Sequence, residues 1–305
     1  MKKNNYIPLS EPYLNGKEIK YTKKCFQDNW VSSSGPYIKD FEKRFASFLG
    51  AKYAVACSSG TAALHLALKA IGILENEIVI VSNLTFIATV NAVRYINAEP
   101  ILIDADIENW QMDVKVLEKF LKNKCVVKNK VCIHKQTKKK ISAILVTHIL
   151  GYSCNVSSLL KIAKKYNIIL IEDAAEALGS KFNKKFLGTF GICGCFSFNG
   201  NKTITTGSGG MLVTNSTKLA KMAKHLSEQA KILGSFYKHS QIGFNYRMSN
   251  IQAAMGMAQI SDLNFRIKRK REIFGKYKKE LSHIKGLSFP KEVINSKSSF
   301  WLTSI

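Results

Sequence analysis

One lysine of this sequence stands among small polar residues. Lys202 lies in the stretch FSFNGNKTITTGSGGML (196–212), which carries glycines at 207, 209 and 210 and an apolar run at either end. Small residues let a bulky planar cofactor lie against the backbone, and a lysine held there can act as a nucleophile toward carbonyl groups. The setting therefore predicts a lysine that reacts with a planar cofactor.

A second pattern could hold a phosphate group. Ser59, Gly60 and Thr61 stand between an apolar run and a helical pattern in CSSGTAALHLAL (57–68). This is the arrangement in which backbone N–H groups at a helix N-terminus bind phosphate. The same residue types also cap ordinary helices, so this pattern alone leaves both interpretations open.

A third pattern is a pair of carboxylates, Glu172 and Asp173, at the end of an apolar run in IILIEDAAEALGS (168–180). Open α/β sheets bind their ligands at the carboxyl ends of buried parallel strands. The alternative is a cap for a helix over AAEALG, which the pattern favours when it is taken by itself.

The fourth pattern is Phe86, which follows an apolar run in NLTFIATVNAVRY (83–95) and could stack on an aromatic ring or belong to the core. Together the four patterns suit pyridoxal 5'-phosphate (PLP). A lysine forms the covalent link to this cofactor, an acidic residue keeps its pyridine nitrogen protonated, and a phosphate cradle anchors its other end.

The elements that must position these residues alternate between strands and helices. Short apolar or β-branched runs predict strands at YAVACSS, EIVIVSN, PILIDAD, ISAILVTH, NIILIEDA, CGCFSFN and GGMLVTN. Amphipathic segments lie between several of them. Near-continuous apolar strands separated by helices predict an α/β domain with a mostly parallel central sheet flanked by helices.

The pattern divides the chain into two parts. Residues 1–248 are expected to form the large domain, and 1–20 are a candidate to pack on a small domain. Residues 249–305 are expected to supply a connecting helix, a strand at SFWLTSI and the start of a small C-terminal domain that is incomplete, as in a truncated or shortened chain. The lysine-rich stretch 122–140 is expected to be an exposed loop.

The net charge of +25 is high, but Lys and Arg are spread along the chain and no nucleic-acid-binding motif accompanies them. A solvated lysine-rich surface is the favoured interpretation, with attraction of a di-anionic nucleotide substrate as an added effect. Seven scattered cysteines argue against a disulfide framework or a metal site. No apolar run is long enough to span a membrane, and MKKNNYIPLS lacks a signal-peptide core, so we expect a cytoplasmic protein.

Six motifs resemble those of the DegT/DnrJ/EryC1/StrS family of PLP-dependent sugar aminotransferases, and the resemblance runs almost from end to end. They are IPLSEPYLNG, NWVSSSGPYIKDFEKRFASFLG, SSGTAALHLAL, EDAAEALGS, FSFNGNKTITTGSGGM and FNYRMSNIQAAMG. The resemblance implies the PLP-dependent aminotransferase fold type I and a homodimer with shared active sites.

Residue by residue, the resemblance implies that Lys202 is the cofactor-linked lysine and proton carrier. Asp173 would pair with the pyridine nitrogen, Glu176 would approach the ring hydroxyl, and Phe86 would stack on the ring. The remaining implied ligands bind phosphate, Asn245 from the neighbouring subunit and, within the chain, Ser59, Gly60, Thr61 and Ser197. Where the family's His-x-Tyr-Gly turn has an aromatic residue, this chain has Leu150.

The implied reaction transfers an amino group from L-glutamate to a 4-keto-6-deoxy sugar nucleotide for glycan or O-antigen biosynthesis. GDP-4-keto-6-deoxy-D-mannose, giving GDP-perosamine, is the favoured substrate, and a UDP- or dTDP-linked keto sugar is an alternative. A non-catalytic sugar-nucleotide-binding protein is a further alternative. A PLP-dependent sugar 3-dehydratase carries histidine in place of the lysine, and Lys202 argues against it.

Overall fold

The computed structural model describes residues 7–232, 234 and 236–305. Its α-helices are α1 (Lys17–Gln27), α2 (Pro36–Leu49), α3 (Gly60–Ile71), α4 (Ile87–Tyr95), α5 (Val114–Lys124), α6 (Val156–Tyr166), α7 (Thr217–Ser227), α8 (Asn250–Ser261) and α9 (Leu263–Leu281). Its central strands are β1 (Tyr53–Cys57), β2 (Ile78–Ser82), β3 (Glu99–Ile103), β6 (Ile141–Thr147), β7 (Ile169–Asp173), β10 (Cys193–Ser197) and β11 (Gly210–Thr214). Its short strands are β4 (Cys125–Lys128), β5 (Val131–His134), β8 (Lys181–Phe182), β9 (Lys185–Phe186) and β12 (Ser296–Lys297).

The central sheet has seven strands in the order β1-β11-β10-β7-β6-β2-β3. Strand β11 runs antiparallel to β1 and β10, whereas the strands from β10 to β3 pair in parallel. Each of the seven predicted strand segments contributes one strand of this sheet, so the predicted mostly parallel α/β fold is confirmed.

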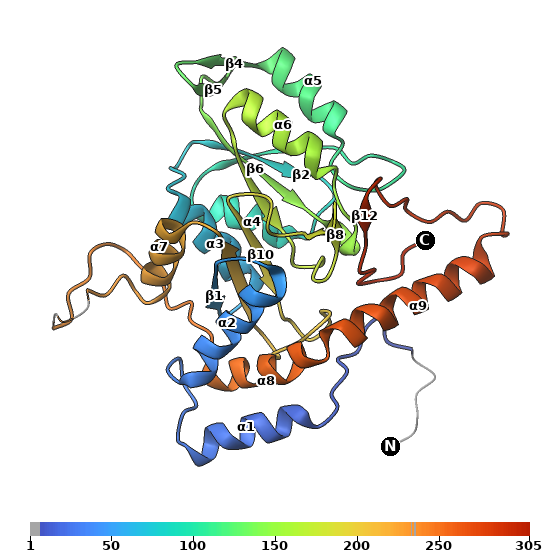
Figure 1. Cartoon of the computed structure of the whole chain (residues 1–305). Coiled ribbons are helices and arrows are strands. Elements are labelled where there is room, and N and C mark those ends of the chain that lie inside the picture. Colours follow the sequence, from blue (N-terminus) through green and yellow to red (C-terminus); the bar gives the residue numbers. More distant parts are fainter. Residues whose placement is uncertain (1–6, 233, 235) are drawn as a thin grey trace.

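Helices cover both faces of the sheet (Figure 1). One core contains apolar side chains of α3, α4 and α7 packed on the sheet, and the cores on the other side contain those of α2, α8, α5 and α6. All five residues of β2 and all seven of β6 are buried, because neither face of these strands meets solvent. This double cover explains the continuous apolar runs in the sequence.

The lysine-rich stretch 122–140 was wrongly predicted to be a loop. It holds the end of α5 and an antiparallel hairpin of β4 and β5. The hairpin turns at Asn129 and Lys130, both with positive φ (48° and 61°), as a tight two-residue hairpin turn requires. Alternating buried residues Cys125, Cys132 and His134 hold one face of it against the domain.

The segment predicted as one connecting helix is two helices, α8 and α9, which meet at Asp262. The carboxylate of Asp262 accepts hydrogen bonds from Asn15 and Lys17 and so ties the start of α1 to this junction. Helix α1 packs along α8 (Figure 1), and the first six residues of the segment 1–20 lie outside the described residues.

The run SFWLTSI is not a strand. Pairing with β8 ends at Lys297, and Phe300 adopts a left-handed backbone conformation (φ 51°) that a strand does not allow. Its aromatic ring stacks instead on Phe274 of α9, with 3.8 Å between ring centroids. Packing of the Phe300 ring against Phe274 therefore takes the place of the expected sheet pairing.

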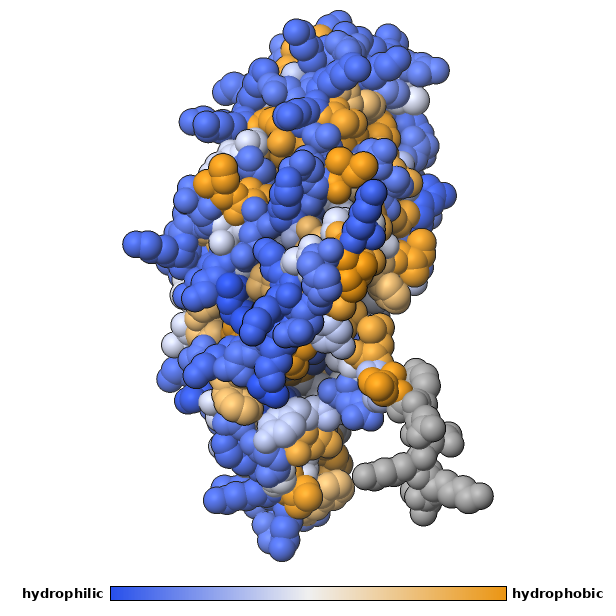
Figure 2. Space-filling view, turned by 90° about the vertical axis from the view of Figure 1, so that its right-hand side faces the viewer, coloured by the Kyte–Doolittle hydropathy of each residue, from blue (hydrophilic) through white to orange (hydrophobic). Residues whose placement is uncertain are grey.

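Hydrophilic side chains cover most of the face seen in Figure 2, with apolar ones in separate groups, as expected for lysines spread over a surface. All seven cysteines are buried and free, and they pack as small apolar core residues. Across the described residues, no helix combines the length and apolar character that crossing a membrane demands.

Candidate active site

The predicted site residues converge on one cavity of about 430 Å³. Its lining includes all of them except Asn245, namely Ser59, Gly60, Thr61, Phe86, Asp173, Glu176, Ser197 and Lys202. Asn245 is exposed and pairs with Glu228 in an isolated β-bridge. The other predicted residues therefore share a site within one chain, and Asn245 lies outside it.

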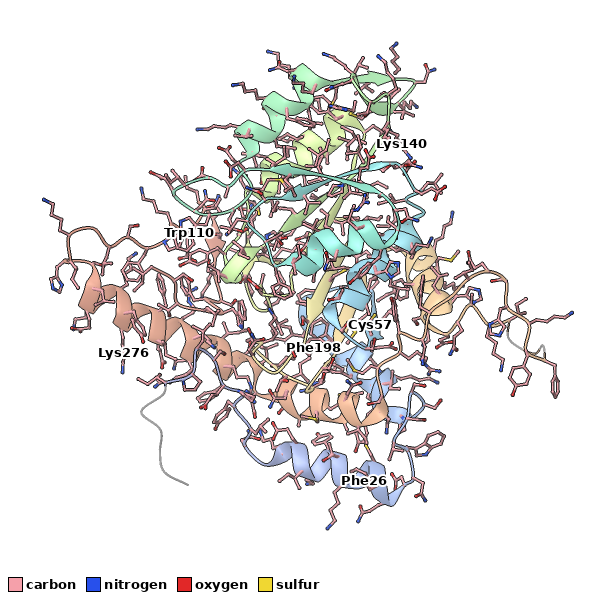
Figure 3. The ribbon with its side chains drawn as sticks, turned by 180° about the vertical axis from the view of Figure 1, so that it is seen from behind. Phe26, Cys57, Trp110, Lys140, Phe198 and Lys276 are labelled. Atoms are coloured by element: carbon pink, nitrogen blue, oxygen red, sulfur yellow. The ribbon has the colours of Figure 1, made fainter. Side chains whose placement is uncertain are left out.

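The sheet explains why these residues meet. Strands β1, β7 and β10 point the same way, so the segments that follow them emerge at the same edge of the sheet. Ser59 follows β1, whereas Asp173 and Ser197 end β7 and β10. Figure 3 labels Cys57, at the end of β1, and Phe198, directly after the end of β10, in the middle of the molecule. The last residues of both strands pair with Gly210 of β11, so the two strand ends lie near each other.

The N-terminus of α3 forms one end of the cavity. The Ser59 hydroxyl accepts a hydrogen bond from the backbone N–H of Ala62 (3.0 Å) and caps the helix. Gly60 lies so close to Ser197 that an added Cβ would approach the Ser197 Cβ to 2.7 Å. The resulting cradle combines free helix-end N–H groups, the helix dipole and a serine hydroxyl, which together suit a phosphate group.

Asp173 lies deep in the site and is only 4% exposed. Its Oδ2 accepts a hydrogen bond from the Thr89 hydroxyl (2.6 Å) and its Oδ1 accepts one from the Ala175 N–H (3.1 Å). Burial raises the pKa of Asp173, and these two hydrogen bonds offset the effect only in part. The segment AAEALG forms turns rather than a helix, so the interpretation of Asp173 as a helix cap is wrong.

The Lys202 amine lies between a carboxylate and an aromatic ring. Its Nζ is 3.4 Å from Oε1 of Glu176 and 3.8 Å from the ring centroid of Trp301. The second carboxylate oxygen of Glu176 accepts a hydrogen bond from the backbone N–H of Leu150 (2.7 Å). Burial raises the pKa of Glu176, and the charge of Lys202 partly offsets this. Leu150 therefore contributes its backbone to the site.

Phe86 stands at the N-terminus of α4, and 67% of its surface is exposed. It lines the cavity and is not a core residue, which leaves its ring face available for contact with a planar ligand. Its stacking role stays a prediction.

Sequence reasoning missed Thr89 and Trp301. Thr89 lies three residues after Phe86 and is fully buried beside Asp173, so the motif TFIAT contained it without marking it. Trp301 reaches Lys202 from a segment about a hundred residues away in the chain, and no local spacing could have paired the two.

The cavity fits PLP on its own geometry. The phosphate cradle at Gly60 exists only because that residue has no Cβ. At the other side, Asp173 is a buried carboxylate with two hydrogen-bond donors and room to accept one from a protonated ring nitrogen. Lys202 supplies a primary amine between these ends. The cavity is thus able to hold a planar, phosphate-bearing carbonyl compound.

Comparison with known proteins gives one consistent result. The model of the DegT/DnrJ/EryC1/StrS aminotransferase family matches residues 12–305. The chain is 44% identical to GDP-perosamine synthase of Escherichia coli O157:H7, over 98% of this chain and 78% of the relative, and 41% identical to that of Vibrio cholerae, over 98% and 77%. The crystal structure of the aminotransferase TlmJ from Streptoalloteichus hindustanus superposes with a TM-score of 0.87 at 26% identity, over 97% of this chain and 76% of that one.

Proposed function

Because this chain belongs to the DegT/DnrJ/EryC1/StrS family and is a PLP-dependent aminotransferase, we propose that it moves an amino group from L-glutamate to a GDP-linked 4-keto-6-deoxy sugar. The observation that carries the proposal is the meeting of Lys202, Asp173 and the Gly60 cradle around one cavity. The net reaction converts glutamate to 2-oxoglutarate and the C4 ketone of the sugar to an amine.

Different residues of the cavity would bind different parts of PLP. Bound PLP supplies an electron sink that stabilises negative charge beside the transferred nitrogen. The α3 N-terminus with Ser59, Thr61 and Ser197 would hold its phosphate. Asp173 would keep the ring nitrogen protonated, because a buried carboxylate and a cation beside it stabilise each other's charge.

Lys202 is the group best placed to move a proton. Its Nζ lies inside the cavity within reach of Glu176, and it is the one lysine that lines the cavity among the residues described. A primary amine at this point can accept the α-proton of the amino-acid substrate and deliver it to the carbon on the other side of the transferred nitrogen. Glu176 orients the amine through Oε1, while Leu150 holds Oε2.

The sugar substrate is inferred from relatives. The proteins of E. coli O157:H7 and V. cholerae that share 44% and 41% identity with this chain are both GDP-perosamine synthases. This supports GDP-4-keto-6-deoxy-D-mannose over a UDP- or dTDP-linked sugar. The positive net charge of +25 would favour capture of either kind of nucleotide diphosphate, so charge does not separate the two.

A stepwise assay tests the proposal. Glutamate added to the PLP-loaded protein should bleach the visible absorbance of the cofactor and release 2-oxoglutarate, and the GDP-keto sugar should restore the absorbance. Lys202→Ala should lower turnover by about four orders of magnitude while PLP still binds through the phosphate cradle and Asp173. Borohydride reduction should attach the cofactor to the peptide that holds Lys202.

Two results would contradict it. Attachment of the cofactor to another lysine would overturn the assignment of Lys202. Recovery of absorbance with the dTDP-linked or UDP-linked sugar, and not with the GDP-linked one, would move the substrate to the alternative class.

We also propose a homodimer in which Asn245 reaches the phosphate site of the partner. Its exposure, and its place outside the cavity of its own chain, support this arrangement. Mixing Lys202→Ala chains with Asn245→Ala chains should restore activity, because each hybrid dimer would hold one site with both residues intact. Failure to recover activity in hybrids of confirmed composition would contradict a shared site.

A further inference from the structure

Trp301 lines the cavity beside Lys202, and the reaction described above gives it no role. Its indole face lies 3.8 Å from the Lys202 Nζ, measured to the ring centroid, and only 5% of the residue is exposed. An ammonium centred over an indole at this distance makes a cation–π contact, and indole is the most favourable ring for it. The amine therefore has two attractive neighbours, Trp301 and Glu176.

The segment that carries Trp301 is fastened to the domain. We call residues 296–301 the strap. At its start β12 pairs with β8, and farther along the backbone N–H of Ser299 donates to the Ser180 hydroxyl (2.9 Å), which itself donates to the carbonyl of Gly151 (2.6 Å). The strap therefore has a fixed path over the turn that follows β6.

A glycine makes that path possible. Gly151 has a positive φ of 87°, and an added Cβ would lie 2.8 Å from both the Ser299 hydroxyl oxygen and the backbone nitrogen of Trp301. Any larger residue would push the strap off the turn. The same turn places Leu150, whose N–H holds Glu176, so both neighbours of the Lys202 amine depend on one turn.

The indole itself is anchored beside the lysine. Its Nε1–H donates to the carbonyl of Asn201 (2.7 Å), the residue that precedes Lys202. The ring is thus tied to the backbone that carries the amine, which fixes its position relative to Lys202.

We propose that Trp301 and Glu176 form a docking place for the Lys202 amine during the part of each cycle in which the amine has no covalent bond to the cofactor. The proposal rests on the assignment of Lys202 made above. Transamination must free this amine and later bind it again. A long lysine side chain that changed rotamer in between would lose its alignment with the cofactor site. Trp301 acts as a positioning residue, since it works through Lys202.

Two variants test the role on the cofactor-free protein. Trp301→Phe keeps an aromatic face and loses the indole N–H, whereas Trp301→Leu loses the face as well. Labelling by an amine acetylating reagent, followed by mass spectrometry, should show Lys202 reacting about fivefold faster in Trp301→Leu and within about twofold of the native rate in Trp301→Phe. The exposed Lys276 serves as the internal standard, and Phe186→Leu, which removes the ring under Lys181, is the matched control.

A second measurement separates docking from simple cover. When PLP is added, its covalent attachment to Lys202 should be about tenfold slower in Trp301→Leu, because the freed amine is no longer aimed. If the ring only shielded the amine from reagents, its loss in Trp301→Leu would instead make both acetylation and PLP attachment faster.

Faster attachment, or no change in either rate, would overturn the proposal. Attachment to a different lysine would instead refute the assignment of Lys202 and hence the proposed function. Far-ultraviolet circular dichroism of each variant checks that the fold is intact. Trp301→Met also lacks an aromatic face and should change both rates as Trp301→Leu does, so it keeps the test decisive if Trp301→Leu fails to fold.

Discussion

Two adjacent carboxylates at the end of β7 occupy opposite sides of the strand and have opposite surroundings. Glu172 accepts hydrogen bonds from His148 (3.0 Å) and from the backbone N–H groups of Gly188, Phe190 and Gly191 (2.7 to 2.8 Å). Asp173 accepts only two, from Thr89 and Ala175. Both are buried, so the difference lies in the donors and not in exposure to water.

The two pKa values follow this difference. Burial by itself raises the pKa of Glu172, but the hydrogen bonds from His148 and the backbone outweigh it and hold the pKa below its ordinary value. Burial dominates at Asp173, and its pKa is raised. Glu172 is thus a satisfied structural anion, whereas Asp173 keeps the capacity to bind a cation. A carboxylate that is to hold a ligand must leave part of its hydrogen-bonding capacity unused.

Among the changes that test this comparison of the two carboxylates, Asp173→Asn should have the largest effect. An amide cannot stabilise a protonated ring nitrogen as a carboxylate does, so kcat should fall about a thousandfold. The cofactor-free variant should be at least as resistant to urea as the native chain, because it buries no charge. Normal turnover in this variant would show that Asp173 only stabilises the turn at Ala175 and does not act on the cofactor.

Glu172→Gln should have the opposite profile. An amide group would turn its NH₂ toward backbone N–H groups and leave them unpaired, which should lower the free energy of unfolding by about 3 kcal/mol. The folded fraction should keep most of its activity, since Glu172 lies outside the cavity lining. Urea unfolding measures the loss. Glu118→Gln, at an exposed pair with Lys165, is the matched control and should leave stability unchanged.

The sequence predicted much of this site because its residues lie at strand ends. The apolar runs identified the parallel strands, and strand ends of one direction must meet at one edge, which brought Asp173, Ser197 and Ser59 together. The different surroundings of Glu172 and Asp173 were beyond prediction, since the donors to Glu172 come from the turn 188–191 and from His148.

The errors have physical causes as well. Lysines hid the alternation of CVVK and VCIH, which with the turn at Asn129 marks a hairpin. In SFWLTSI, apolar composition indicated a strand, but Phe300 and Trp301 are buried by aromatic and cation–π contacts instead. Composition predicts burial there and cannot say which partner supplies it.

A smaller effect is expected from the hydroxyl that holds Asp173. Thr89→Val keeps the shape of the side chain and removes the hydrogen bond to Oδ2, which should lower kcat about tenfold and raise the pKa of Asp173 further. Thr89→Ser, which retains the hydroxyl, should preserve activity. Equal rates in the valine and serine variants would show that shape alone matters at this position.

The smallest effect, and the sharpest comparison, is the pH dependence of stability in the cofactor-free protein. The raised pKa of Asp173 means that its contribution is fully favourable below its ordinary value, about pH 4, and is lost as the pH rises through the value in the folded chain. The lowered pKa of Glu172 gives the reverse, a contribution present above its ordinary value and lost as the pH falls through the folded value. Glu172 and Asp173, although adjacent on one strand, should therefore make the free energy of unfolding change with pH in opposite directions. Urea unfolding between pH 3 and pH 8 should show that Asp173→Asn gains stability over the native chain as the pH rises above the ordinary pKa of Asp173. Glu172→Gln should lose stability relative to the native chain as the pH rises toward the ordinary pKa of Glu172 and stay level above it. Parallel curves for the two variants would mean that the donors around each carboxylate do not set its charge, and the distinction between an anchoring and a ligand-binding carboxylate would fail.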